Sequence, residues 1–139
     1  MKMGCAILVL LACALVALLG YLDWHGYFDR GTFEIGQTAW SPSNRLAVVV
    51  TRSDQQAMSS YTTFVLITDH LPTTAEIRHA YHSDAPVFAA ANPCLTVSWA
   101  GPDRLVIACR GALVTSDQID VERSQIDGIQ VHYEGIPAK

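Results

Sequence analysis

The segment His79-Ala80-Tyr81-His82, followed by Asp84, holds the densest group of side chains that could bind a metal or carry a proton. Imidazole nitrogens and carboxylates are common zinc ligands, and histidine is a frequent general base at neutral pH. Histidines that share one metal are commonly two residues apart on a strand or four apart on a helix, and the spacing of three fits neither. His79 and His82 are therefore candidates for the site of a metal-dependent enzyme, but the spacing favours solvated surface histidines.

Other arrangements that catalysis requires do not occur in the sequence. There is no G-x-S-x-G turn for a nucleophilic serine and no glycine-rich loop that would bind a phosphate. The acidic residues late in the chain lack the spacing of a calcium-binding loop; they are Asp117, Asp120, Glu122 and Asp127. We therefore expect a noncatalytic protein without a cofactor, with a hydrolase or metal-dependent enzyme as an alternative.

A polar loop is the candidate binding surface. Residues 54–61 carry Met58 and Tyr61 among small polar residues, and Asp54 and Gln55 begin the loop. Because the loops of a β domain commonly contact partners, we predict binding residues at Asp54, Gln55, Met58 and Tyr61. A loop that contacts only solvent is the alternative.

The composition restricts the class of protein. The chain has 139 residues, which is enough for one domain. Its net charge is −4, from thirteen acidic and nine basic residues, and no run of like charge occurs. Because nucleic-acid binding normally needs a clustered basic surface, we expect no nucleic-acid partner.

The amino-terminal segment is apolar and long enough to cross a membrane. Residues 4–22 contain no charged side chain, and a helix of that length spans roughly 28 Å, close to the hydrocarbon core of a bilayer. Lys2 precedes the segment and Asp23 follows it, so the positive-inside rule retains the amino terminus in the cytoplasm and exports the rest. Aromatic residues suited to the membrane interface follow; they are Tyr21, Trp24, Tyr27 and Phe28.

These observations divide the chain into four parts. We predict a cytoplasmic terminus at 1–3, a lipid-contacting anchor at 4–22, a juxtamembrane linker at 23–31 and an exported domain at 32–139. Two other interpretations of the apolar segment are open: a signal peptide cleaved at Ala12-Cys13-Ala14, or a lipoprotein with Cys13 lipidated. Both would leave an apolar stretch directly after the cut, which favours the uncleaved anchor.

Beyond the linker the residue pattern becomes that of strands. Short segments rich in β-branched and aromatic residues are typical of strands; they occur at 32–36, 46–52, 61–70, 94–99, 104–109 and 129–134. Asp127-Gly128 is a strong two-residue hairpin signal. The predicted fold is all-β, a small antiparallel sheet or sandwich of about six to seven strands after one transmembrane helix. The alternation of Ile77, His79 and Tyr81 predicts one more strand, and the alanines around Ala89 predict a loop or a short turn of helix.

Cys94 and Cys109 flank a predicted hairpin, CLTVSWAGPDRLVIAC. Exported cysteines meet oxidising conditions, which favour a disulfide. A four-residue loop at 100–103 would place the two cysteines directly opposite each other, within bonding range. We predict this disulfide, with a structural role, and two separate buried thiols as the alternative.

The apolar faces of the same hairpin favour a different register. They match when Trp99 pairs with Leu105, which places Cys109 opposite Leu95 and one residue away from Cys94. A bulge near Gly101 would reconcile the two registers. The sequence therefore leaves the register open.

The pattern W-x-x-x-x-R-L occurs twice, at 40–46 and 99–105. A tryptophan that ends one strand and a leucine that begins the next can face the same core, while the arginine stays in solvent. Each pattern resembles the hairpin turn of β-propeller blades. A propeller needs at least four blades of about forty residues, more than this chain supplies, so we expect only the hairpin to be shared.

A broader resemblance covers most of the exported part. The chain resembles a family of small bacterial membrane-anchored envelope proteins through Ser41-Pro42 with Arg45, a polar loop entering Phe64-Val65, and Trp99 with Leu105. It departs from that family in having Ser43-Asn44 where Asp-Gly is usual. The resemblance implies the bacterial inner membrane, with the domain in the periplasm, and no known activity. We therefore expect a binding or scaffolding protein with an envelope protein as partner; a membrane-held immunity or inhibitor protein is the alternative.

Overall fold

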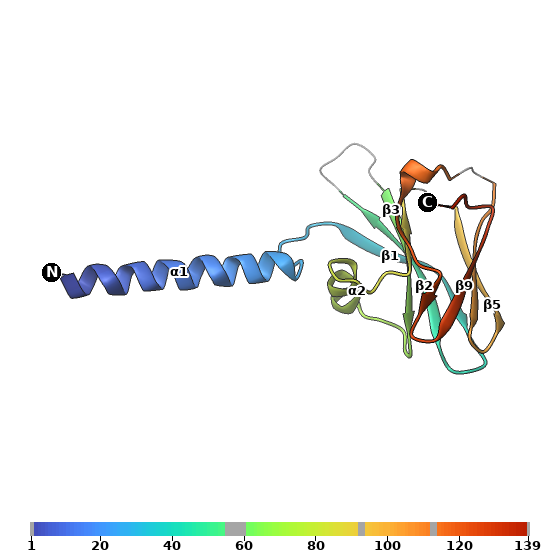
Figure 1. The fold of residues 1–139 in the computed structure, drawn as a ribbon, viewed down its shortest axis with the longest axis horizontal. Coiled ribbons are helices and arrows are strands. Elements are labelled where there is room, and N and C mark those ends of the chain that lie inside the picture. Colours follow the sequence, from blue (N-terminus) through green and yellow to red (C-terminus); the bar gives the residue numbers. More distant parts are fainter. Residues whose placement is uncertain (1, 55–60, 92–93, 112–113, 139) are drawn as a thin grey trace.

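The computed structural model describes residues 2–54, 61–91, 94–111 and 114–138. A long helix, α1 (Lys2–Trp24), extends from one side of a two-sheet β sandwich (Figure 1). The five-stranded sheet has the order β1-β2-β3-β4-β7, and the four-stranded sheet has the order β5-β6-β9-β8. The strands are β1 (Thr32–Trp40), β2 (Leu46–Ser53), β3 (Tyr61–Thr68), β4 (Phe88–Ala90), β5 (Leu95–Gly101), β6 (Arg104–Cys109), β7 (Ile119–Glu122), β8 (Gln125–Ile126) and β9 (Ile129–Glu134). Over Ala6–Trp24, α1 is long and apolar enough to cross a membrane.

The structure confirms a mostly β domain after an apolar helix and corrects the details. Nine strands occur in the described part of the chain, more than the six to seven of the sequence-based prediction. The prediction of an all-β, antiparallel fold is wrong in two respects: helix α2 (Thr74–Tyr81) and the 3-10 turn η1 (Ser116–Gln118) are present, and β6 pairs with β9 in parallel. Strands β4 and β8 have only three and two residues, which is too few to show a period of two.

Helix α2 replaces the strand that the alternation of Ile77, His79 and Tyr81 predicts. The Thr73 hydroxyl accepts a hydrogen bond from the Glu76 N–H at 3.3 Å, and the Glu76 carboxylate accepts one from the Thr73 N–H at 2.7 Å. This capping box satisfies N–H groups that have no partner in the first helical turn. The hydrogen bonds from the Thr73 backbone and hydroxyl lower the pKa of Glu76 to about 2. Ile77 and Tyr81, four residues apart, share the helix face that packs on the sheet.

Ala89 lies in strand β4, so the prediction of a loop or a short helix there is wrong. β4 pairs with β3 on one side and β7 on the other, and its three residues are buried. Phe88 packs between the two sheets, and Ala89 packs on the opposite face, against α2. Tertiary packing therefore decides the conformation of this segment over the weak strand propensity of alanine.

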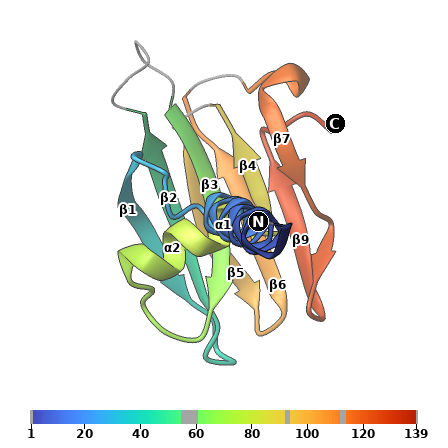
Figure 2. The same cartoon turned by 90° about the vertical axis from the view of Figure 1, so that its left-hand side faces the viewer.

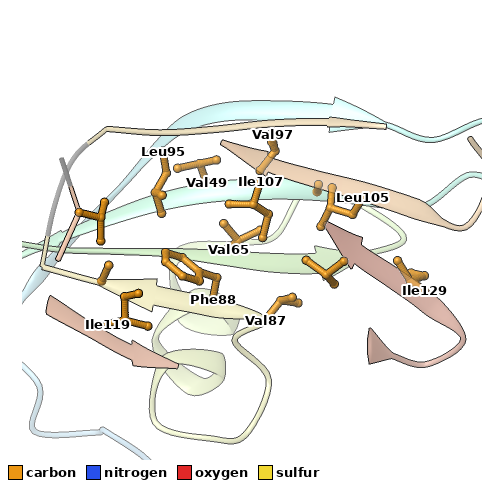
Figure 3. Close-up of a cluster of buried hydrophobic side chains, with 14 residues drawn as sticks. Val49, Val65, Val87, Phe88, Leu95, Val97, Leu105, Ile107, Ile119 and Ile129 are labelled. Atoms are coloured by element: carbon orange, nitrogen blue, oxygen red, sulfur yellow. The ribbon is translucent and has the colours of Figure 1, made fainter. Parts of the chain in front are cut away.

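Apolar side chains fill two layers of core. The larger cluster lies between the sheets, where Val65 of one sheet meets Ile107 of the other (Figure 3). The smaller cluster lies between the five-stranded sheet and α2 and includes Phe64, Leu66 and Ile77. Because successive strand residues point to opposite faces, β3 supplies side chains to both clusters. The five-stranded sheet is therefore the middle layer, and α2 lies on its face turned toward α1 (Figure 2).

Two polar side chains join the sheets at the edge formed by β1 and β5. The Gln37 amide donates a hydrogen bond to the Val97 carbonyl at 3.1 Å and accepts one from the Val97 N–H at 3.1 Å. The Trp99 indole N–H donates to the Ala39 carbonyl at 2.8 Å. The pairing of β1 with β2 is irregular between Ile35 and Gln37, and such bulges redirect side chains. The Gln37 side chain thus makes the two backbone hydrogen bonds to Val97 that a neighbouring strand would make.

The two W-x-x-x-x-R-L turns lie side by side, since the Ser43 hydroxyl donates to the Pro102 carbonyl at 2.6 Å. Trp99 packs against the core between the sheets. Trp40 is 56% exposed, so the prediction that the tryptophan of each turn faces the core is wrong for Trp40. Asn44 has a φ of +59°, a conformation that asparagine tolerates better than most residues. The turn therefore forms without the usual glycine.

Cys94 and Cys109 form a disulfide, with their Cα atoms 4.9 Å apart. The hairpin adopts the register in which Trp99 pairs with Leu105, so Leu95 lies opposite Cys109. Cys94 precedes the first paired residue of β5, and its carbonyl accepts a hydrogen bond from the Arg110 N–H at 3.3 Å. The disulfide therefore joins diagonal neighbours, and the prediction that the two cysteines lie directly opposite each other is wrong. A bulge is present between Trp99 and Gly101, as predicted, but the pairing from Leu95 to Trp99 is regular, so the bulge does not bring Cys94 opposite Cys109.

Candidate functional site

The candidate site lies where the chain leaves α1 and enters the β domain. α1 ends at Trp24, and β1 begins at Thr32. Between them, two side chains contact the end of β2 and the end of α2. We call the five contacting side chains the junction: His25, Asp29, Arg52, His79 and His82. The segment predicted as a linker is therefore docked on the domain.

Asp29 lies at the centre of the junction, and its side chain is only 3% exposed. Its Oδ1 accepts hydrogen bonds from Arg52 Nη2 and from the Gly31 N–H, both at 2.7 Å. Its Oδ2 accepts one from Arg52 Nε at 3.1 Å and lies 2.8 Å from His82 Nε2. Arg52 thus binds both carboxylate oxygens, the fork geometry of strong Arg–carboxylate pairs. Asp29 alone therefore connects the linker to both β2 and the end of α2.

The electrostatics keep both members of the Asp29–Arg52 pair charged. Burial alone would raise the pKa of Asp29. Hydrogen bonds from Arg52, from the Gly31 backbone and from His82 outweigh that effect and hold the pKa of Asp29 well below its usual range. The hydrogen bond to Asp29 raises the pKa of Arg52 against the opposing effect of burial. The carboxylate is therefore ionised throughout the neutral pH range.

Aromatic rings hold the Arg52 guanidinium in place. Its Cζ lies 5.1 Å from the ring centroid of Tyr81 and 6.0 Å from that of Phe33, within the range of cation–π attraction. The two rings contact each other with centroids 5.7 Å apart and pack on the core beneath α2. The Arg52 side chain is 16% exposed. The core of the domain therefore positions the Arg52 guanidinium that binds Asp29.

Gly26 allows the close approach of the linker to α2. Its φ is +69°, in the left-handed region that glycine adopts without strain. A Cβ at this position would lie 2.1 Å from a ring carbon of His82. A side chain here would therefore displace the imidazole that contacts Asp29.

His25 and His79 form a second contact between the linker and α2. Their Nδ1 atoms are 3.4 Å apart, and their rings are nearly parallel with centroids separated by 5.2 Å. His82 contacts Asp29 instead, so the two candidate metal ligands have different partners. Within the described ranges, no group of three or more His, Cys, Asp or Glu side chains could hold a metal ion.

The contact between Asp29 and His82 has the form of the orienting half of a nucleophilic triad. In a triad, the other ring nitrogen takes a proton from a hydroxyl or thiol. Asp29 occupies Nε2 of His82, and no hydroxyl or thiol of the described residues hydrogen-bonds to its Nδ1. The geometry therefore fits an electrostatic connection between the linker and the domain.

A cavity of about 390 Å³ lies beside the Asp29–Arg52 pair. Its lining includes Asp23, Phe28, Arg30, Arg52, Asp54 and His82. Asp54, one of the four predicted binding residues, thus lies beside the junction. Tyr61 begins β3 and is 52% exposed. Gln55 and Met58 lie outside the described residues.

Sequence reasoning missed the junction, although two signals point to parts of it. The T-x-x-E pattern at 73–76 is the signature of a capping box, and the helix starting there carries His79 in its last turn and His82 at its C-cap. Arg52 follows an apolar run in β2, where an uncompensated charge would be costly. Neither signal identifies Asp29 as the partner.

Comparison of the chain with protein-family models, with curated proteins and with solved structures finds no match. Its function is therefore inferred from the apolar helix, the junction and the disulfide.

Proposed function

We propose that this chain is a single-pass protein of the bacterial inner membrane. Its helix α1 stays attached, and its noncatalytic β domain lies in the periplasm, where it binds or supports another envelope protein. The observation that carries the proposal is the docking of the linker on the domain through Asp29.

The junction and the apolar residues before it support a retained helix over a signal peptide cleaved at Ala12-Cys13-Ala14. His25 and Asp29 are contacts of the folded domain, so a cut that preserves the junction has to come before residue 25. A cut after Ala14 would leave the apolar residues 15–22 in water, where Val16 is 69% exposed. Burying one such side chain is worth about 1.5–3 kcal/mol. A membrane is the environment that removes this surface from water.

Charge and redox chemistry support the orientation. Lys2 precedes the apolar segment and Asp23 follows it, which favours export of the domain under the positive-inside rule. The disulfide between Cys94 and Cys109 suits an oxidising compartment such as the periplasm. The resemblance to bacterial envelope proteins points to the same compartment.

The arrangement of polar groups supports binding over catalysis. Asp29, Arg52 and His82 hydrogen-bond to one another and join parts of the chain. The connection between β2 and β3 then offers a contact surface on a scaffold positioned by the junction. Asp54 and Tyr61 flank that connection, and we assign the partner contact to it.

An alkaline phosphatase fusion joined after residue 30 is expected to be active, because the helix exports the polypeptide on its carboxyl-terminal side. The unfused chain should remain in carbonate-washed membranes at its full mass of 15.2 kDa. The control is Leu15→Arg, whose charge near the middle of the span costs about 3 kcal/mol on insertion and should reduce retention. An inactive fusion, or a shortened soluble chain, would overturn the proposal.

Site-specific photo-crosslinking in cells tests the partner surface. A photoreactive residue in place of Tyr61, which is 52% exposed, should give one discrete protein adduct of reproducible mass. The matched control is the same residue in place of Leu71, which is 61% exposed and lies before α2; it should not give that adduct. Identical adducts at both positions, or none at Tyr61, would contradict a contact surface at this loop.

A further inference from the structure

If α1 spans the membrane, the cavity beside Asp29 lies at the depth of the lipid headgroups. The ligand inferred below therefore rests on the proposed function. The apolar span ends at Trp24, and the cavity lining begins at Asp23 and continues along the linker to Arg30. Headgroups occupy about 5–7 Å on each side of the hydrocarbon core. Trp24 and Tyr27 are 76% and 70% exposed, as expected of aromatic side chains at the membrane interface. The cavity therefore lies beside the end of the span, where headgroups are present.

The lining of this cavity carries both signs of charge. Arg52 compensates the buried charge of Asp29. Arg30 is exposed, and among the described residues it makes no ion pair. Asp23 adds an exposed carboxylate to the same lining, and among the described residues it makes no ion pair. A ligand matched to this cavity therefore needs an anionic group for Arg30 and a cationic group for Asp23.

We propose that the cavity binds the headgroup of an amino-phospholipid. Arg30 receives the phosphate, because a guanidinium makes charge-assisted hydrogen bonds to phosphate oxygens. Asp23 receives the primary ammonium, which offers three N–H donors. A choline headgroup has no N–H to donate, and a glycerol headgroup has no cation for Asp23. The volume of about 390 Å³ is at the small end of ligand sites and suits a headgroup whose acyl chains stay in the bilayer.

Native mass spectrometry of the full chain in detergent tests this site. The chain is titrated separately with phosphatidylethanolamine, phosphatidylcholine and phosphatidylglycerol. We expect one phosphatidylethanolamine adduct per chain, formed about tenfold more readily than an adduct of either other lipid. Arg30→Gln and Asp23→Asn should each weaken that adduct about tenfold. Arg45→Gln, which removes an exposed arginine of the β1–β2 turn, should leave it unchanged.

Three results would overturn the inference. They are equal adducts from all three lipids, a preference for phosphatidylglycerol, and phosphatidylethanolamine binding that survives both Arg30→Gln and Asp23→Asn. A titration with inorganic phosphate tests the source of the ligand. If phosphate binds in a manner that depends on Arg30 and no lipid adduct forms, the ligand is a soluble phosphate and the lipid site is overturned.

The same preparations distinguish this inference from the proposed function. Membrane retention of the wild type and of each variant is measured by carbonate washing before detergent is added. A retained chain without a lipid adduct overturns only the headgroup site. A chain released from the membrane overturns the anchor itself.

Discussion

Replacing Asp29 with asparagine is expected to lower the free energy of unfolding of the full chain by about 2–3 kcal/mol. The substitution keeps the size of the side chain but leaves the Arg52 guanidinium beside a neutral amide. Removing one partner of a fully buried ion pair costs about 3–5 kcal/mol. The side chains of Arg52 and His82 are 16% and 29% exposed, so water reaches them and the cost is smaller. The loss nevertheless exceeds that of an ordinary surface substitution, which stays within about 0.5 kcal/mol.

Urea unfolding of the full chain in detergent micelles, followed by the circular dichroism of the β domain, measures this loss. Asp103→Asn is the matched control, because it removes an exposed carboxylate from the β5–β6 turn. The double variant Asp29→Asn with Arg52→Gln should lose less than the sum of the single variants, since no charge is left unpaired. Equal stability of Asp29→Asn and the wild type, or additive losses, would contradict the role of the pair.

The pH dependence of the same measurement follows from the lowered pKa of Asp29. The unfolded chain has an ordinary aspartate near 3.8, so the stabilisation is fully present above that pH. As the pH falls below about 4, the unfolded chain takes up a proton that the folded chain does not, and stability decreases by up to 1.4 kcal/mol per pH unit. The Asp29→Asn variant has no carboxylate at this position and therefore lacks this pH-dependent stabilisation. The stability difference between wild type and variant should therefore shrink as the pH falls, while a constant difference would contradict the assignment.

The central strands could be predicted because local sequence and tertiary environment agree there. Residues 46–50 of β2 and 64–66 of β3 are buried and are rich in the β-branched and aromatic residues that strands favour. The turn at Asp127-Gly128 is equally local: both residues have positive φ, at +47° and +80°, which this dipeptide accepts readily. Such features need no knowledge of distant residues.

Helix α2 shows how one pattern can fit two structures. Ile77, His79 and Tyr81 alternate like strand residues, but Ile77 and Tyr81 are also four residues apart, as on one face of a helix. The capping box formed by Thr73 and Glu76 resolves the ambiguity, because it stabilises a helix that begins at Thr74. A prediction that weighs the cap against the alternation would have found the helix.

The junction could not be predicted because it depends on packing between distant segments. Asp29 is 23 residues from Arg52 and 53 from His82, and the three meet only when α2 lies on the sheet beside the linker. The two histidines that the sequence names as weak metal candidates have separate partners for the same reason: His79 contacts His25, and His82 contacts Asp29. Of the predicted binding residues, Asp54 lines the cavity at the junction. A partner contact at Asp54, Gln55, Met58 and Tyr61 stays a prediction.

Removing the disulfide by replacing both Cys94 and Cys109 with alanine is expected to lower the free energy of unfolding by about 3 kcal/mol. The bond connects residues 15 apart in the sequence, and the chain-entropy model gives about that value for a loop of this length. Both cysteines pack against the core between the sheets, so alanine keeps the positions apolar. The expected loss therefore reflects the closed loop more than the packing.

Reduction of the wild type should reproduce the urea midpoint of the double alanine variant, because both open the same loop. Cys13→Ala is the control, since Cys13 is a free cysteine of α1 and its removal leaves the loop closed. Thiol labelling of the unfolded chain without reductant should modify two of the four cysteines, and all four after reduction. A chain that labels fully without reductant, or a double variant with the wild-type midpoint, would contradict the prediction. Full labelling of the chain as taken from cells would also remove the support for an oxidising compartment, because the bond would then not have formed where the domain resides.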